Sequence, residues 1–534
     1  MRRTTIVAAI AVILSALLVI HARGTDAAPV ARVAAADQLG KVDFPTSCSP
    51  QAQPIIEKGV ALLHSFQYQQ AEATFTEGAK QDPQCAIAHW GEAMSLYHQL
   101  WDFPDSDTLA KGRSEVAQAQ KLAPNTGREH GYIDAAAAFY QDAKLSHAAR
   151  VRAYAAAMEQ LHGDFPGDVE ASAFYALSLV NLADYGEENV NLKKAIAILD
   201  PLFQQYPDNP GIAHYLIHAT DTPELAPQGL AAARRYAQIA PDSSHALHMP
   251  SHIFTRLGLW QESIDSNIAA SAAAAKATAA HQADAGYQLH AMDYLNYAYL
   301  QSGQEAKARE VLADLKNVTG ASADEIGQHE SWFSSRDALE LHRWKEAAAL
   351  EPPKIQPRSL DATYFVRVVG AARSGDAKAA RADLKKLNAA MSAQSHQMKH
   401  MGYSPSSGPS VEQQEAEAWL KFAEGKKDDA LKLMRDAADR EDASGLDSLS
   451  MPAREMLGDM LLELKRPAEA LEAYRISLKE SPNRFDGLWG AAQSAQAAGD
   501  ASAAKGFYAR LVEISGAAAD RPELREARGY LAEK

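Results

Sequence analysis

Several features are scarce in this 534-residue sequence, and each shortage narrows the class of protein. Runs of β-branched residues are few, whereas Ala, Leu, Glu, Lys and Gln are abundant, which favours helix almost throughout. Positive charge is in deficit, and the formal net charge is −15. We therefore expect no nucleic acid as the main partner, because phosphate binding requires a basic surface. Apart from a stretch near the N-terminus, no segment is apolar enough to span a membrane.

Familiar catalytic motifs are missing as well. The sequence contains no phosphate-binding glycine loop and no His-Glu-x-x-His metalloprotease motif. Its serine, histidine and aspartate residues show no recognisable nucleophile context. Motifs alone therefore predict no reaction, and whether the protein is an enzyme stays open at this point.

Only two cysteines occur, Cys48 and Cys85. They lie just before the first helix and just after the second helix of the first predicted helical hairpin, and antiparallel helices bring such ends together. One interpretation is a disulfide, which an exported protein can keep. The other is a pair of unrelated thiols.

The N-terminus has the pattern of an export signal. Arg2 and Arg3 give a positive start, residues 6–20 are apolar apart from Ser15, and small residues follow near Ala27. We expect a cleaved signal peptide over 1–27 and a flexible segment over 28–47, in a protein exported to the periplasm or beyond the cell. The alternative is an uncleaved anchor, although the apolar run is short for a spanning helix. After cleavage no stable membrane span remains.

A 34-residue pattern of small, aromatic and proline residues runs along the chain. The unit starting at Met451 has, at positions 8, 11, 20, 24 and 32, the residues Gly458, Leu461, Ala470, Tyr474 and Pro482. The unit starting at Ala52 has, at the same positions, Gly59, Leu62, Ala71, Phe75 and Pro83. This pattern resembles the tetratricopeptide repeat, a helix–turn–helix unit. Small residues let two helices approach, an aromatic at position 24 fills the space between units, and proline ends the second helix.

The resemblance implies an all-α, tetratricopeptide-type α-solenoid, a right-handed superhelix of helical hairpins with a concave groove. Twelve hairpins are expected, with starts near 52, 86, 128, 169, 210, 244, 289, 328, 361, 411, 451 and 485. We expect one array over 48–400 containing a histidine-rich groove, C-terminal repeats over 411–520, and a tail or capping helix over 521–534. The segments HYLIHA and HMPSHI are also similar to a group of exported bacterial tetratricopeptide proteins. Turns between paired helices are predicted at the position-15 glycines Gly258, Gly303, Gly375, Gly425 and Gly499.

Histidines recur at the spacing of the repeat. His214 and His248 are 34 residues apart, and so are His218 and His252. In three successive units position 5 is His214, His248 and Asp293, and position 9 is His218, His252 and Tyr297. These positions share one helix stripe, which lines the groove in tetratricopeptide arrays. We therefore expect one strip that also includes Asp221, His245, Arg256 and His290.

Imidazole suits zinc, copper and iron, and His-x-x-x-His is a common ligand pair. A divalent transition metal is thus one hypothesis, with the ligands His214, His218, His248, His252 and Asp293. A polar groove for a peptide, protein or other ligand is a second, with the contacts His245, Arg256, His290, Tyr297 and Asp221. Plain structural hydrogen bonding is a third. Pro250 weakens the pattern, because it removes a helix bond and would leave His245 and His248 on the preceding loop.

Two further groups attract attention. His64 and His98 occupy position 13 of adjacent units, where they form either a second groove patch or aromatic packing. Residues 391–401 gather methionine and histidine, which are soft ligands for copper or simply the end of a solvated helix. From the residues and the resemblance together, two functions are expected: an exported scaffold that binds a ligand in its groove, or a metalloprotein, possibly an enzyme.

Overall fold

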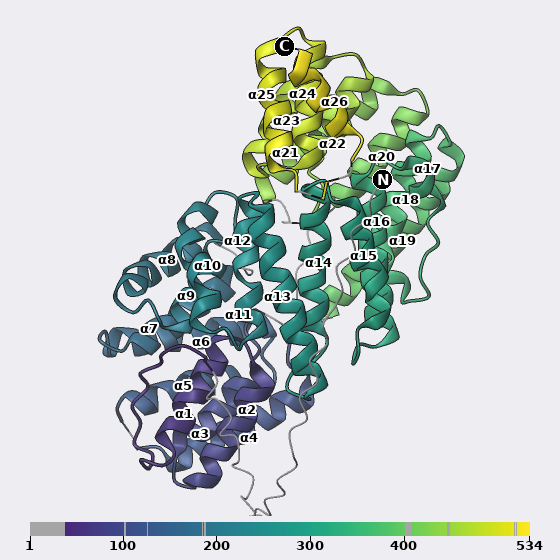
Figure 1. Ribbon diagram of the computed structural model, residues 1–534. Helices are drawn as coiled ribbons and strands as arrows, with labels where there is room; N and C mark the ends of the chain where they lie inside the picture. Colours follow the sequence, from purple (N-terminus) through teal and green to yellow (C-terminus); the bar gives the residue numbers. More distant parts are fainter. Residues whose placement is uncertain are drawn as a thin grey trace, which may run out of the picture. The chain divides into compact units, whose positions relative to one another are not determined.

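The computed structural model describes residues 38–100, 103–124, 126–183, 185, 188–400, 408–445, 449–516, 518–519 and 521–533 (Figure 1). Every regular element in these residues is a helix. The predicted signal peptide over 1–27 lies outside the described residues, as does the first half of the predicted flexible segment over 28–47. None of the described helices combines the length and apolar character needed to cross a bilayer.

The helices follow each other as hairpins that begin close to the predicted starts. The N-terminal six are α1 (Gln53–His64) with α2 (Tyr68–Gln81), α3 (Ala86–Ser95) with α4 (Ser106–Leu122), α5 (Arg128–Tyr140) with α6 (His147–Asp164), α7 (Val169–Ala183) with α8 (Glu188–Gln205), α9 (Pro210–Ala219) with α10 (Ala226–Ile239), and α11 (Ser244–His248) plus α12 (Pro250–Arg256) with α13 (Trp260–Ala279).

The C-terminal hairpins continue the pattern. They are α14 (Gly286–Gln301) with α15 (Glu305–Asp314), α16 (Ala323–Glu340) with α17 (Trp344–Ala349), α18 (Asp361–Arg373) with α19 (Ala377–His400), α20 (Val411–Ala423) with α21 (Lys427–Ser444), α22 (Ala453–Glu463) with α23 (Pro467–Glu480), and α24 (Phe485–Ala497) with α25 (Ala501–Ile514). Short 3₁₀ turns at Leu315–Asn317 and Pro357–Ser359 interrupt the series, and α26 (Glu523–Glu533) ends it. The fold is therefore the all-α tetratricopeptide-type solenoid.

Glycine and aromatic positions of the repeat set how closely the helices approach. A Cβ atom added at Gly59 would lie 2.6 Å from Cζ of Phe75, and one at Gly91, in the next unit, 2.2 Å from Cδ1 of the same ring. Tyr474 fills the same place between Gly458 and Gly490. The predicted role of the position-24 aromatic, which packs between two units, is confirmed.

The turns inside the hairpins need a left-handed backbone. The five predicted turn glycines all have positive φ, between 63° and 85°. In several units without a glycine at position 15, the residue there takes the same conformation, as Phe66 does at φ 52°. Only glycine adopts this conformation without steric cost, so Phe66 stores local strain.

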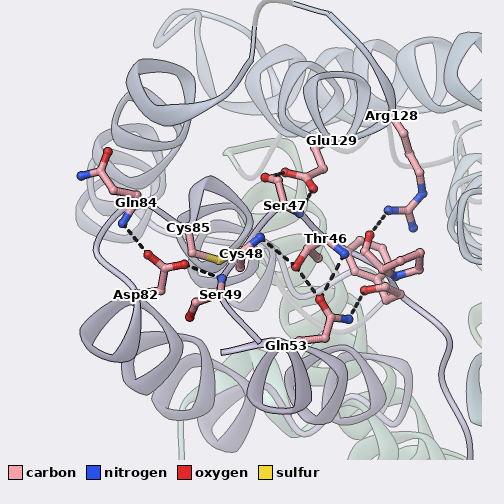
Figure 2. The surroundings of a disulfide bond; sticks show 12 residues. Thr46, Ser47, Cys48, Ser49, Gln53, Asp82, Gln84, Cys85, Arg128 and Glu129 are labelled. Atoms are coloured by element: carbon pink, nitrogen blue, oxygen red, sulfur yellow. Dashed lines mark hydrogen bonds between the residues drawn. A yellow bond between two sulfur atoms is a disulfide. The ribbon is translucent and has the colours of Figure 1, made fainter. Parts of the chain in front are cut away.

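Cys48 and Cys85 form a disulfide, so the pairing interpretation is the one observed (Figure 2). The carboxylate of Asp82 lies beside the bond and accepts from the backbone N–H of Ser49 at 2.6 Å and of Gln84 at 3.0 Å. These bonds lower the pKa of Asp82. In the chain-entropy model a bridge spanning 37 residues stabilises the fold by about 3–4 kcal/mol.

Residues 38–534 form one compact unit, in which distant hairpins also touch. The indole N–H of Trp260 donates to the carbonyl of Asn483 at 2.7 Å, and the Asn483 amide donates to the carbonyl of Gly258 at 3.2 Å. Arg484 is buried and pairs with Glu340 and Glu455 at 2.9 and 3.0 Å. The array is therefore joined across more than 220 residues of sequence, and not only between neighbouring hairpins.

Candidate metal centre

Six histidines between residues 214 and 290 lie close together in the fold, and four helices carry them. Helix α9 carries His214 and His218, α11 carries His245 and His248, α12 carries His252, and α14 carries His290. They form two groups whose ligand nitrogens lie within 4.8 Å of one another. We call them the first triad (His214, His218, His245) and the second triad (His248, His252, His290). The triads adjoin, since the ring centroids of His245 and His248 are 6.2 Å apart.

In the second triad, hydrogen bonds determine which nitrogens carry hydrogen. Nδ1 of His252 lies 2.8 Å from a carboxylate oxygen of Asp221, which can only accept. Nδ1 of His248 lies 2.7 Å from Oδ1 of Asn267, whose amide nitrogen donates to the carbonyl of Ser263. As neutral rings, both histidines donate through Nδ1 and have a free lone pair on Nε2. These two Nε2 atoms face each other at 3.0 Å.

In the first triad, one histidine is arranged in the same way. Nδ1 of His214 donates to the backbone carbonyl of His64 at 2.6 Å, which leaves Nε2 bare, 3.1 Å from Nε2 of His245. Nε2 of His218 is buried without a hydrogen-bond partner. Phe66 closes this side, with its ring centroid 4.5 Å from that of His214. Buried polar atoms normally have partners, so an orphaned nitrogen here indicates a missing ligand.

Two bare lone pairs at 3.0 Å repel each other unless a cation lies between them. In a tetrahedral zinc site, two histidine nitrogens are roughly 3.3 Å apart. Ligating histidines commonly donate their other ring hydrogen to a carboxylate, an amide or a backbone carbonyl. His248 and His252 in the second triad and His214 in the first follow this arrangement.

The histidines also have the protonation state that metal ligation needs. Burial, followed by the neighbouring rings, lowers the pKa of His214, His245 and His248 well below the usual value. The same causes lower the pKa of His218 to about 3 and that of His290 to about 4. At neutral pH these rings are therefore uncharged, with a lone pair available for a metal.

The cluster is more enclosed than the predicted strip along an open groove. His214, His245, His248 and His252 are between 0% and 9% exposed. Helix packing covers them, with only His218 and His290 half-buried. Asp221 and Arg256 line an adjoining cavity of about 370 Å³, and Arg256 donates to the carboxylate of Asp221 at 2.9 Å. Asp221, the residue that orients His252, therefore separates the second triad from this cavity.

Two predicted strip residues lie elsewhere. Asp293 forms an ion pair with Arg336 at 2.7 Å and belongs to neither triad, so the carboxylate of the predicted ligand set does not join the histidines. The hydroxyl of Tyr297 accepts from Arg484 at 2.5 Å and does not reach the histidines. Each of these two side chains is held by an arginine from outside helix α14. Both therefore point away from the triads.

Two residues of the site were not predicted. The hydroxyl of Tyr294 lies 3.1 Å from Nδ1 of His252, and Asn267 orients His248. Asn267 lies on α13, a second helix of its hairpin, whereas the sequence argument considered only first helices. The sequence signal for this residue was a single asparagine in the alanine-rich stretch 260–279, and the structure shows that it is fully buried.

The predicted loop position of His245 and His248 is wrong, because both residues lie in the short helix α11, which ends just before Pro250. Proline is tolerated because it stands in the first turn of α12, where no intrahelical partner is lost. Met249 keeps helical angles, with φ −53° and ψ −34°, between α11 and α12. Helix α11 supplies His245 to the first triad and His248 to the second, and α12 supplies His252 to the second.

The other predicted histidine groups are packed among aromatic rings. His64 is fully buried between Glu170 at 2.6 Å and the hydroxyl of Tyr215 at 2.9 Å. His98 stacks on Tyr68 with a centroid distance of 4.4 Å. Residues 391–401 belong to the end of α19 as far as His400, and Met401 lies outside the described residues.

Comparison with known proteins identifies one stretch of the chain as tetratricopeptide repeat. Residues 415–485 match the model of a tetratricopeptide repeat family. The sequence has no match among curated proteins. Among solved structures, the human IFIT1 dimer with m7Gppp-AAAA is 12% identical, with 85% of this chain and 94% of that chain covered and a TM-score of 0.37. Yeast Tom70 is 10% identical, with 90% and 96% covered and a TM-score of 0.32. Tetratricopeptide repeats are typical of protein-binding scaffolds.

Proposed function

We propose that this protein binds divalent transition-metal ions at two adjacent three-histidine sites. One observation carries the proposal: His248 and His252 direct bare Nε2 lone pairs at each other across 3.0 Å, while their Nδ1 hydrogens are held by Asn267 and Asp221. Retaining that arrangement in a buried cluster is unfavourable without a cation. The buried, unpartnered Nε2 of His218 supports a second ion at the first triad.

The donor set narrows the choice of metal. Three neutral imidazoles suit zinc and copper, whereas the usual iron(II) site needs a carboxylate ligand. Asp293 is held by Arg336, which makes iron the least favoured of the three metals considered. A three-ligand site leaves a fourth position for water or a substrate atom. Such a site can support catalysis, and the proposal itself covers binding.

We further propose that the protein is exported, as its N-terminal pattern indicates. The disulfide supports this, since such bonds persist mainly in oxidising compartments. A second candidate function is the binding of a peptide or protein segment on the concave face of the array, which the repeat match over 415–485 favours. Peptide binding of that kind would survive removal of the histidines, so the two functions are separable.

Metal analysis of defined variants tests the metal proposal. The protein is stripped with a chelator, reloaded with zinc or copper, and measured by elemental analysis after desalting. We expect roughly two ions per chain, falling to about one in His248→Ala plus His252→Ala, because the first triad is kept. Loss of the first triad in His214→Ala plus His245→Ala should lower the content equally.

The matched control is His281→Ala plus His396→Ala, which removes two exposed histidines outside both triads. Its metal content should equal that of the unmodified protein. Circular dichroism verifies that each variant keeps its helical signal. Unchanged metal content in both triad variants, or no metal in the reloaded protein, would contradict the proposal.

A further inference from the structure

A second polar site lies away from the histidines, in a cavity of about 410 Å³. Helices α16, α18, α19, α20 and α21 contribute to its lining, and this volume is in the range of small-molecule sites. One part of the wall is apolar and includes Trp332, Phe365 and Met391. The remaining wall is rich in carboxylates.

Most of these carboxylates lack a cationic partner. Asp293 is paired with Arg336, and Glu340 is paired with Arg484. Within the part of the chain that the structure describes, no ion pair involves the other four, which are Asp361, Glu412, Glu415 and Glu441. The cavity therefore has an excess of acidic groups without a cationic partner, facing an apolar surface.

Glu415 is the clearest sign of a missing ligand. Its residue is 3% exposed, and its Oε1 atom is buried with no hydrogen-bond partner. Burial, together with the charge of Glu441, raises the pKa of Glu415. An unpaired carboxyl group in such a place is costly, and a ligand cation would compensate it.

The spacing of the carboxylates argues against a metal ion. Among the described residues, the groups of three donors within 4.8 Å of one another include none of Asp361, Glu412, Glu415 and Glu441. A single small cation therefore cannot take three of these carboxylates as ligands at once. Separated positive charges on an apolar chain fit both the carboxylates and the Trp332 and Phe365 surface.

We propose that this cavity binds an aliphatic di- or polyamine. Its ammonium groups pair with Glu415 and Glu441, and its methylene chain lies on Trp332 and Phe365. The site is independent of the histidine triads. A lysine side chain of a peptide shares this chemistry, and the experiment separates it from the free amine.

Isothermal titration calorimetry with spermidine and putrescine tests the proposal on the full chain. We expect saturable binding that weakens by roughly thirtyfold in Glu415→Gln, because a buried charge pair is lost. Glu441→Gln should weaken it in the same direction. Glutamine has the shape of glutamate and removes a buried charge, so Glu415→Gln is expected to fold, as thermal melting verifies.

The matched control is Glu417→Gln, on the same helix but half-exposed and paired with Lys421 at 3.2 Å. Its affinity for spermidine should be unchanged. The His248→Ala plus His252→Ala variant should also bind spermidine normally. Three results would overturn the proposal: no binding of either amine, equal affinity in Glu415→Gln, or binding of a lysine tripeptide or Mg²⁺ in place of the amines.

Discussion

At the scale of single residues, burial governs the charge of the polar groups in this protein. Burial lowers the pKa of five triad histidines, and it raises the pKa of buried carboxyl groups such as Glu441, to about 7. In both cases the neutral form is favoured, since a desolvated charge is unfavourable. The fold therefore contains groups that take up or release protons when it unfolds.

Asp337 gives the clearest dependence of stability on pH. It is 8% exposed, and burial raises its pKa to about 6, against an unfolded value of 3.8. As pH falls from 7 to 4, Asp337 is thus protonated near pH 6 in the folded protein, whereas in the unfolded chain it is protonated only near pH 4. Its contribution to the free energy of unfolding rises by on the order of 3 kcal/mol as pH falls through this window.

Urea unfolding of Asp337→Asn at pH 4, 5.5 and 7 checks this expectation. The variant should gain stability relative to the unmodified protein at pH 7 and lose that advantage at pH 4. Asp436→Asn, at an exposed ion pair with Lys432, is the control and should show no such trend. A constant difference between Asp337→Asn and the unmodified protein at all three pH values would contradict it.

Residue-level prediction from the sequence succeeded where the repeat sets the geometry. His214 and His248 lie at the same position of adjacent units, so their convergence follows from the period. It failed for Asp293 and Tyr297, whose arginine partners come from α16 and from the residue just before α24. Such partners, 43 and 187 residues away, are not visible in a helix pattern.

At the scale of helices, close approach depends on residues without a side chain. Gly490 on α24 lies against the ring of Tyr474 on α23, where an added Cβ atom would be 2.2 Å from Cζ. Tyr474 also donates to the carboxylate of Asp459 at 2.6 Å, which holds the ring in place. The contact between these two helices therefore has no room for a methyl group.

Gly490→Ala should lower the free energy of unfolding by about 1–3 kcal/mol through overpacking. Gly506→Ala on the neighbouring helix α25 is a matched control, because nothing lies within 4 Å of its added Cβ atom. That control should stabilise by roughly 1 kcal/mol through helix propensity. Thermal denaturation compares the two, and equal effects of the same sign would refute the packing argument.

Helix positions were the most predictable part of the fold. Small and aromatic residues recur at constant spacing because each unit meets its neighbour in the same way, so Gly59 and Phe75 indicate a contact directly. The two short helices on either side of Met249 were harder to foresee, since proline ends a helix in most interior positions but is accepted in a first turn.

At the scale of the whole described chain, a buried charge network joins remote hairpins. Arg484 is 0% exposed, and it contacts Glu340 on α16, Glu455 on α22 and the hydroxyl of Tyr297 on α14. Removing its charge would leave two buried carboxylates without a partner. The network also explains why these elements cohere although they are far apart in sequence.

Arg484→Ala should destabilise the protein by about 3–5 kcal/mol and speed hydrogen exchange in α14, α16 and α22 together. Arg475→Ala, at an exposed pair with Asp500, should cost less than about 1 kcal/mol. Exchange mass spectrometry and thermal melting measure both variants. Faster exchange confined to α24 would show that Arg484 does not connect the other helices.

The bonds from Gly258 and Trp260 to Asn483 have a mechanical consequence. Repeat arrays held only by adjacent units extend under load like a soft spring, and each unit yields a little. Here a cross-link of hydrogen bonds spans half the array, so tension would meet a stiff regime first and then a sudden release when those bonds break. A pulling experiment would record this as a force peak ahead of the gradual lengthening.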